Sequence, residues 1–507
     1  MKIESAEIPV SRLALLAVAT VAVHGYHLGA DDAAIYIPGI KQVFDPSLYP
    51  FGSAFFLSHA HLSLFSNLIG GSARLAHLPI DPTMLAWHAV SILLLLAAGW
   101  RVASACFEAP EGRWGAVLLL AATLSVPVAG TALMLMDPYL TARSLSTPLA
   151  LFAVASCVAR GVVKLRWETA MWLLLTALIH VQMTVYAVAF IAALWLAERL
   201  AARSEAAGGL APALAALPFF LDLSPARGPA GEALHTRTFF FVSGWAWYEW
   251  VGVIAPLVLA WLLSRVRWRR VTPMLALLLR TLLPFGAAFT LFWLALSVSP
   301  RLENLTRLQP MRALHILYLL FFLLTGGLLG QMLLRRTLWR WLALFVPLGA
   351  GMWMLQNAAY AHSPHVEWTE RCGGNAWLEA FYWIRHNTPH NAVFALDPLY
   401  LKSDGQDEHG FRAVAERSVL ADEFKDSGAV SLFPALGEEW KAESQAQTGI
   451  DRFDAADLQR LSAIYPVDWA VLRLPAPAGL SCPYHNARLA VCRIERVAPP
   501  VARMLDH

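Results

Sequence analysis

Residues 83–105, TMLAWHAVSILLLLAAGWRVASA, form a long apolar run with a single charge, Arg101. A helix needs about 20 mostly apolar residues to cross the hydrocarbon core of a bilayer, so this run predicts a membrane-spanning helix. Further runs of the same character bring the prediction to about eleven spanning helices. They are residues 12–28, 114–135, 144–160, 168–181, 183–199, 207–222, 246–264, 273–298, 312–334 and 338–356.

The composition of the whole chain agrees with a membrane protein. Hydrophobic residues make up 57% and charged residues 15%, whereas an ordinary soluble domain carries about 25% charge. Disordered chains, collagen-like fibres and small disulfide scaffolds are excluded, because their compositions differ. Nucleic acid is not an expected partner, because no basic stripe lies beside stacking aromatic residues.

Charge divides the chain into two domains. Residues 1–357 contain 25 Lys and Arg and 16 Asp and Glu, whereas the shorter segment 358–507 contains 14 and 20. We therefore expect a polytopic α-helical membrane domain over 1–357, with interfacial helices within 29–82, followed by a soluble α/β domain over 358–507. In the second domain we expect helices at 376–386, 411–416 and 453–464 and strands at 392–396, 418–421, 467–474 and 488–493, with Asp454 as a helix N-cap.

The distribution of Lys and Arg predicts the orientation in the membrane. With the N-terminus inside, sixteen of them fall on the cytoplasmic side and eight on the other, which follows the positive-inside rule. An odd number of spans then places 358–507 in the periplasm of a bacterium, with the chain in the inner membrane. An oxidising periplasm favours a disulfide between Cys482 and Cys492 and leaves Cys372 free; three free thiols are the alternative.

The first candidate site residues are Asp31 and Asp32, which directly follow the first apolar run. A carboxylate beside a low-dielectric wall, with a second carboxylate next to it, has a raised pKa and can serve as a general base. We favour Asp32 as the base, with Tyr36 one helical turn away, and we expect Asp31 to cap the segment. The alternative is a helix cap with a solvated neighbour.

Further polar residues lie at the predicted membrane boundary. Asp137 and Arg143 suggest a site for a phosphate-bearing ligand, and the alternative is an ordinary ion pair. His180 is a cavity residue or a hydrogen-bonded core histidine. Arg307 and Arg312 suit phosphate recognition, and the alternative is snorkelling to lipid headgroups. A metal site at the His59-Ala60-His61 stretch is disfavoured, because residues two apart diverge on a helix.

These features together resemble the GT-C superfamily, the polytopic glycosyltransferases that use lipid-phosphate-linked sugars. The resemblance rests on the Asp31-Asp32 pair, the long first outer loop, the Asp137 and Arg143 loop and the C-terminal outer domain. The chain is also similar to bacterial membrane proteins that carry the stretches HGYHLGADDAAIYIPG and DPYLTARSLSTPL. The resemblance implies an outward-facing site, a polyprenyl-phosphate sugar donor and an Asp of the first outer loop as base.

The chain departs from the pattern of the oligosaccharyltransferase-like members. They carry an acid pair, one residue apart, in the second outer loop to hold a metal, whereas Asp137 stands alone before Pro138 and Tyr139. A metal-free mechanism without a cofactor is therefore favoured over one that uses a divalent metal. The expected partners are a lipid-linked sugar donor, membrane lipid and an acceptor that the sequence does not identify.

Two other functions are also compatible with the sequence. A transporter or flippase of lipid-linked saccharide would place polar residues at mid-helix depth and would have broken helices in paired halves. A non-catalytic membrane scaffold would use the C-terminal segment to bind a partner. The segregation of acids, Arg and His to one predicted membrane side favours the glycosyltransferase.

Overall fold

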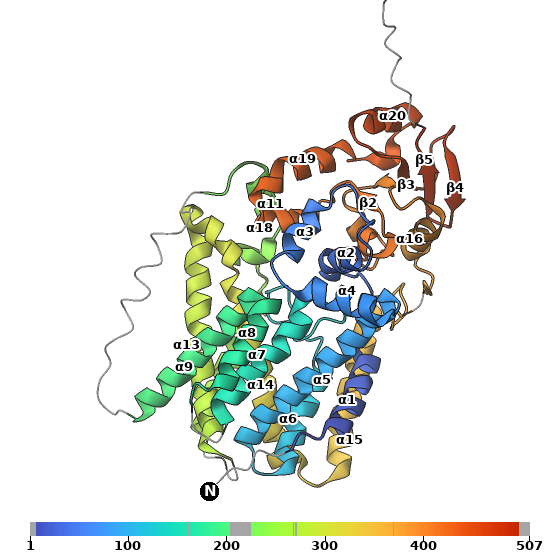
Figure 1. The fold of residues 1–507 in the computed structure, drawn as a ribbon. Helices are drawn as coiled ribbons and strands as arrows, with labels where there is room; N and C mark the ends of the chain where they lie inside the picture. Colours follow the sequence, from blue (N-terminus) through green and yellow to red (C-terminus); the bar gives the residue numbers. More distant parts are fainter. Residues whose placement is uncertain are drawn as a thin grey trace, which may run out of the picture.

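The computed structural model describes residues 7–159, 163–202, 225–266, 268, 271–368 and 370–495. A bundle of long helices forms one end of the molecule (Figure 1). Within the described residues, six helical segments are long and apolar enough to cross a membrane, which is consistent with a polytopic helical membrane domain. They are α5 (Ile80–Cys106), α9 (Val181–Ala202), α12 (Trp247–Arg265), α13 (Pro273–Val298), the run Pro300–Leu334 that contains α14 (Leu314–Leu329), and α15 (Leu338–Ala359).

The prediction of about eleven spanning helices is therefore too high, and six spans among the described residues do not give the odd number from which the sequence placed 358–507 in the periplasm. Three of the predicted spans form apolar helices of only 15, 17 and 13 residues: α1 (Val10–His24), α7 (Ala142–Val158) and α8 (Trp167–Ile179). The run 114–135 forms only the end of α6 (Pro110–Ala122), and irregular chain follows it. The run 207–222 lies outside the described residues. Hydropathy counts apolar residues but does not detect where a helix ends.

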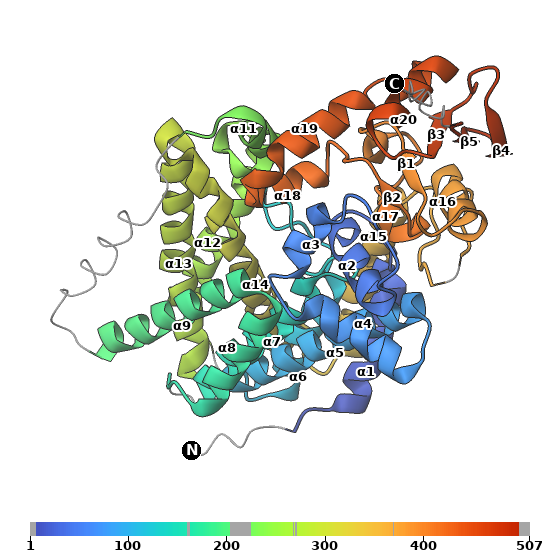
Figure 2. The same ribbon diagram turned by 45° about the horizontal axis from the view of Figure 1, so that its top comes forward.

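The loop between α1 and α5 folds into three short helices. They are α2 (Ala33–Phe44), α3 (Ala54–Ala60) and α4 (Phe65–Ala76). In both views they lie between the helix bundle and the C-terminal segment (Figures 1 and 2). The sequence predicted interfacial helices within 29–82, and all three helices lie in that range.

The C-terminal segment contains the α/β elements that the sequence predicted. The helices are α16 (Ala376–Asn387), α17 (Phe411–Ala415), α18 (Asp426–Leu432), α19 (Gly437–Ala446) and α20 (Ala455–Ile464). The strands are β1 (Val393–Ala395), β2 (Ser418–Val419), β3 (Trp469–Arg473), β4 (Ser481–His485) and β5 (Leu489–Arg493), in the order β2-β1-β3-β5-β4. β2 and β3 run parallel to β1, and β5 pairs antiparallel with both β3 and β4. Helices α18 and α19 and strand β4 were not predicted.

Two local predictions in this segment are confirmed. The Asp454 side chain caps α20 by accepting a hydrogen bond from the backbone N–H of Asp457. Cys482 on β4 and Cys492 on β5 form a disulfide, while Cys106, Cys157 and Cys372 are free.

The C-terminal segment is joined to the end of α1 by backbone contacts. Tyr26 forms a parallel β-bridge with Val366, and Ala30 forms an antiparallel one with His409. Gly29 makes this close approach possible: its φ is +77°, and a Cβ there would lie 2.9 Å from the Cβ of Ala413. The stretch that carries Asp31 and Asp32 is thus enclosed between the bundle and the C-terminal segment.

The remaining elements complete this end of the bundle. Helix α11 (Gly228–His235) packs against α18 and α19, as both views show (Figures 1 and 2). Short 3₁₀ turns η3 (Thr238–Phe240) and η4 (Val242–Gly244) precede α12, and η5 (Pro300–Leu308) and η6 (Pro310–Ala313) join α13 to α14. A π-helical turn η7 (Gly330–Leu334) follows α14.

Candidate functional site

The predicted acids and one predicted arginine meet at the end of the bundle that faces the C-terminal segment. Asp32 lies at the N-terminus of α2, and Arg143 lies in the first turn of α7. One guanidinium nitrogen, Nη2 of Arg143, donates to Asp32 Oδ2 at 3.0 Å and to Asp137 Oδ2 at 2.8 Å. Arg143 and Asp137 are almost fully buried, whereas the Asp32 side chain keeps 24% of its surface exposed.

A lysine from the C-terminal segment completes this group. Lys425 Nζ bonds to Asp31 Oδ1 and lies 3.9 Å from Asp32 Oδ1. The hydroxyl of Tyr139 donates to the other oxygen of Asp31 at 2.8 Å. We refer to Asp31, Asp32, Asp137, Arg143 and Lys425 as the Asp32 cluster. Lys425 was not predicted, because nothing in the sequence signals that residues almost 400 positions apart will meet.

Local structure explains how Arg143 reaches the cluster. The hydroxyl of Ser144 accepts a hydrogen bond from the backbone N–H of Thr141 and so stabilises the first turn of α7. The carbonyl of Pro138 accepts a hydrogen bond from the N–H of His27 at 2.8 Å, which links this loop to the stretch before Asp31. The two motifs singled out in the sequence are therefore in direct contact.

Arg312 and Arg237 add positive charge near Asp32. Within the described part of the chain, Arg312 has no carboxylate partner, its Nε has no hydrogen-bond partner, and its guanidinium lies 5.6 Å from the ring centre of Phe239. Gln182 and Tyr186 of α9 donate to the carbonyls of Leu308 and Gln309, which fixes the turn before Arg312. Arg237, which the sequence did not single out, donates to Ser427 Oγ at 2.8 Å.

The positive charges of the cluster reverse the expected shift in the pKa of Asp32. Burial alone would raise the pKa of the Asp32 carboxyl, but the positive charges of Arg143 and Lys425 lower it below its ordinary value. Asp137 behaves in the opposite way, because burial raises its pKa despite the contact with Arg143. The prediction of a raised pKa at the Asp31-Asp32 pair is thus wrong for Asp32, since the sequence did not reveal the cations that face it.

The other predicted residues lie around the cluster in different roles. The Tyr36 hydroxyl and His59 Nε2 are hydrogen-bonded at 3.1 Å, so Tyr36 is a partner of His59. Burial lowers the pKa of His59 to about 4, which leaves it neutral. Asp31 does not cap α2; the helix begins after Asp32, and neither side chain accepts a capping hydrogen bond.

His180, Arg307 and Arg312 are the remaining site residues that the sequence predicted. His180 ends α8 and lies within electrostatic range of Arg143, His59 and Arg312. Arg312 acts electrostatically on Asp32. Arg307 lies in η5, and its role in binding phosphate stays a prediction.

A buried histidine–glutamate group supports the stretch that carries the two acids. Glu367 Oε1 is 2.8 Å from His27 Nδ1, and Glu367 Oε2 is 2.9 Å from His409 Nε2 and from the backbone nitrogen of Leu28. His27 also stacks on Tyr360, with ring centres 3.6 Å apart. These contacts hold the segment between α1 and Asp31 against the C-terminal segment.

The chain has no match among protein-family models or among curated proteins. Among the described residues, no three His, Cys, Asp or Glu side chains are arranged to hold a metal ion. The Asp32 cluster combines three carboxyl groups with several cations at one end of a helix bundle.

Proposed function

We propose that this chain is a membrane glycosyltransferase of the GT-C type that moves a sugar from a polyprenyl-phosphate donor to an acceptor. The observation that carries the proposal is the contact of Arg143 with Asp32, next to Arg312, at the end of an apolar helix bundle. A lipid-linked donor has an apolar chain and a phosphate next to each other. The apolar helices can contact the chain, and Arg143 and Arg312 can bind the phosphate.

The cations would bind the phosphate of the donor. Arg312 has no carboxylate partner among the described residues, so it can take an anionic ligand without breaking an ion pair. Guanidinium groups match phosphate oxygens in two-point contacts, and a charge-assisted contact of this kind is stronger than a neutral one. When the sugar leaves, the same groups stabilise the negative charge that develops on the lipid phosphate.

Asp32 would act as the base that takes the proton of the acceptor hydroxyl. In the free protein its carboxylate is paired with Arg143 and is a weak base. A bound phosphate shares the charge of Arg143, and the pKa of Asp32 then rises toward a more useful value. The acceptor oxygen forms its bond to the anomeric carbon as the bond to the phosphate oxygen breaks, and the proton passes to Asp32.

The placement of positive charge supports an outward-facing site. Arg101 and Arg113 lie where α5 ends and α6 begins, and Arg336 bonds to Glu111 at the same end. The opposite end of α5 contacts the C-terminal segment through Asp81 and Arg385. By the positive-inside rule, the Asp32 cluster and the C-terminal segment are then periplasmic in a bacterial inner membrane.

A turnover assay tests the proposal. The full chain in lipid nanodiscs is supplied with a panel of undecaprenyl-phosphate-linked monosaccharides and with bacterial envelope lipids and glycans as acceptors, and released undecaprenyl phosphate is measured. Asp32→Asn keeps the shape of the side chain and should lower turnover by about 10²–10⁴-fold.

Asp45→Asn is the matched control, because Asp45 lies in the same loop and its carboxylate bonds to Ser47, away from the cluster. Turnover with this variant should equal that of the wild-type chain. Release no greater than in empty nanodiscs across the whole panel would contradict the proposal, and full turnover by Asp32→Asn would contradict the role of Asp32.

A further inference from the structure

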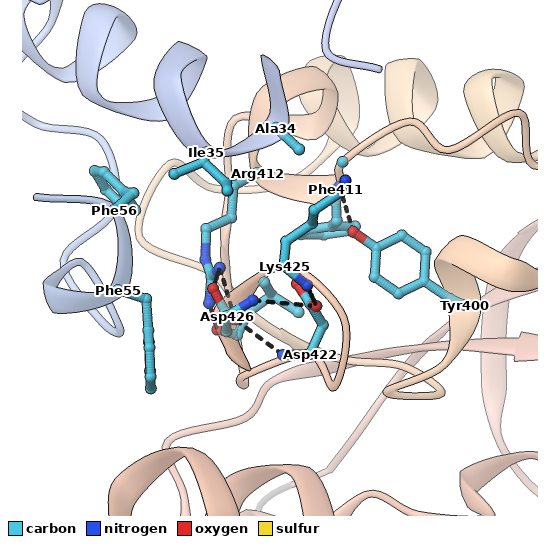
Figure 3. A pocket seen from close by; sticks show the side chains of 12 residues that line it. Ala34, Ile35, Phe55, Phe56, Tyr400, Phe411, Arg412, Asp422, Lys425 and Asp426 are labelled. Carbon is cyan, nitrogen blue, oxygen red and sulfur yellow. Dashed lines mark hydrogen bonds and ion pairs between the residues drawn. The ribbon is translucent and has the colours of Figure 1, made fainter. Parts of the chain in front are cut away.

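A second polar site lies beside the Asp32 cluster, between the first loop and the C-terminal segment. It is a cavity of about 20 Å³, enough for one water-sized group. Ala34, Ile35, Phe55 and Phe56 come from α2 and α3, and the facing side chains come from the C-terminal segment (Figure 3). In that view Phe55 and Phe56 lie on one side of the pocket and Tyr400 on the other.

Asp422 lines this cavity, and its two carboxylate oxygens differ in their hydrogen bonds. Its Oδ1 accepts the backbone N–H groups of Phe424, at 2.8 Å, and of Lys425, in the turn before α18. Its Oδ2 has no hydrogen-bond partner among the described residues. The neighbouring Asp426 differs, because both of its oxygens are bonded to Arg412, at 2.8 and 2.9 Å.

The cavity is connected to the Asp32 cluster by Lys425. This residue lines the cavity and its Nζ bonds to Asp31. Asp422 and Lys425 keep 7% and 5% of their surface exposed, so the cavity is narrow but not sealed. A single hydroxyl group has the size to enter, and it can donate a hydrogen bond to the free oxygen of Asp422.

We infer that this cavity binds one hydroxyl group of a saccharide or polyol, with Asp422 as the hydrogen-bond acceptor. The inference rests on the proposed function in one respect: the polyhydroxylated ligand is the acceptor of the glycosyl transfer. Lys425 separates the bound hydroxyl from Asp31. In this arrangement the cavity binds one hydroxyl of the acceptor, while Asp32 takes the proton of another hydroxyl of the same molecule.

The protonation of Asp422 gives the inference a specific signature. Burial and the negative charge of Asp426 raise the pKa of Asp422 to about 6. A carboxylate accepts a hydrogen bond more strongly than the neutral acid, so affinity should fall as the pH drops through this value. From pH 7.5 to pH 5 the ionised fraction falls about tenfold, which sets the largest expected loss of affinity. The titratable or charged groups that face Asp422 are Asp426, Arg412, Lys425, Tyr400 and Arg237.

Saturation-transfer NMR on the full chain in nanodiscs, prepared free of glycoside detergent, tests the inference. The probes are methyl glucoside, methyl galactoside, methyl mannoside and glycerol, each titrated at pH 5 and pH 7.5. We expect at least one probe to bind more weakly at pH 5. Asp422→Asn retains an oxygen that accepts the backbone N–H groups of Phe424 and Lys425, so the fold is preserved, but it should weaken binding about tenfold or more and abolish the pH dependence.

Glu423→Gln is the matched control, because Glu423 is the next residue in the chain and does not line the cavity; it should bind as the wild type does. Binding that is equal at both pH values and unaffected by Asp422→Asn overturns the inference, and so does the absence of binding by every probe. Undecaprenyl phosphate binding to the same nanodiscs is measured in parallel and depends on the donor side alone, so this inference and the proposed function can fail separately.

Discussion

Lys41 is the centre of a buried charge network that holds the first loop against the C-terminal segment. Its Nζ lies 3.1 Å from Asp81 Oδ1 and 2.7 Å from Glu416 Oε1, and the Lys41 side chain is only 1% exposed. Arg385 pairs with the same two acids, at 2.7 and 2.9 Å. The four residues belong to α2, α5, α16 and the end of α17, so the network connects the helix that begins at Asp32 with three other elements.

Lys41→Met removes one charge and keeps most of the apolar stem. Two carboxylates then share the single guanidinium of Arg385 in a buried setting. Removing one partner from a buried ion pair costs about 3–5 kcal/mol, because it leaves an uncompensated charge. The free energy of unfolding should fall by about this amount. The double variant Lys41→Met/Glu416→Gln balances the charges again and should recover at least about half of the loss.

Unfolding in mixed micelles of increasing SDS fraction, followed by tryptophan fluorescence, measures these differences. Lys441→Met is the matched control, because Lys441 pairs with Glu232 on the surface, where the two side chains are 31% and 54% exposed. An exposed pair contributes about 0–1 kcal/mol. A Lys41→Met variant as stable as the control, or a double variant no more stable than Lys41→Met alone, would refute the account of this network.

Three further predictions concern the site and its orientation. Arg143→Lys keeps the charge but loses the guanidinium fork, so donor turnover should fall well below that of the control Arg74→Lys on the exposed face of α4. Equal turnover would show that Arg143 only contacts lipid headgroups. A reporter that is active only in the periplasm should be active when fused after residue 507. Activity of a cytoplasmic reporter at the same position would show that the site faces the cytoplasm. Unreduced peptide mass spectrometry should recover Cys482 linked to Cys492, and alkylation of both thiols without reduction would show that they are not paired in the cell.

The sequence predicted the composition of the site better than its electrostatics. Asp31 and Asp32 were singled out as a possible general base in a low-dielectric setting, and Asp137 and Arg143 as a site for a phosphate-bearing ligand. The structure brings all four together. The predicted direction of the pKa shift of Asp32 was wrong, because the shift depends on Arg143 and Lys425, which come from other parts of the chain. Local patterns carry no information about such distant partners.

The fold was predictable where local signals are strong. The helices predicted at 376–386 and at 453–464, the second with Asp454 as its N-cap, are confirmed as α16 and α20. Strand β4 was missed because residues 475–486 carry several Pro, Gly and Asn residues, which indicate turns, although β4 pairs with β5 in the sheet. The docking of the C-terminal segment on the stretch from Tyr26 to Asp31 was also beyond the sequence, since its β-bridges and the Glu367 contacts join residues more than 300 positions apart.

A cryo-EM structure of the full chain with undecaprenyl phosphate tests the central claim most directly. The account predicts phosphate density between Arg143 and Arg312, with the 3.0 Å contact between Arg143 and Asp32 lengthened or broken. The lipid chain should run along the apolar helices from that point. A lipid phosphate bound only at the opposite, arginine-rich end of the bundle, or an Asp32 cluster that is unchanged at saturating lipid, would contradict the account.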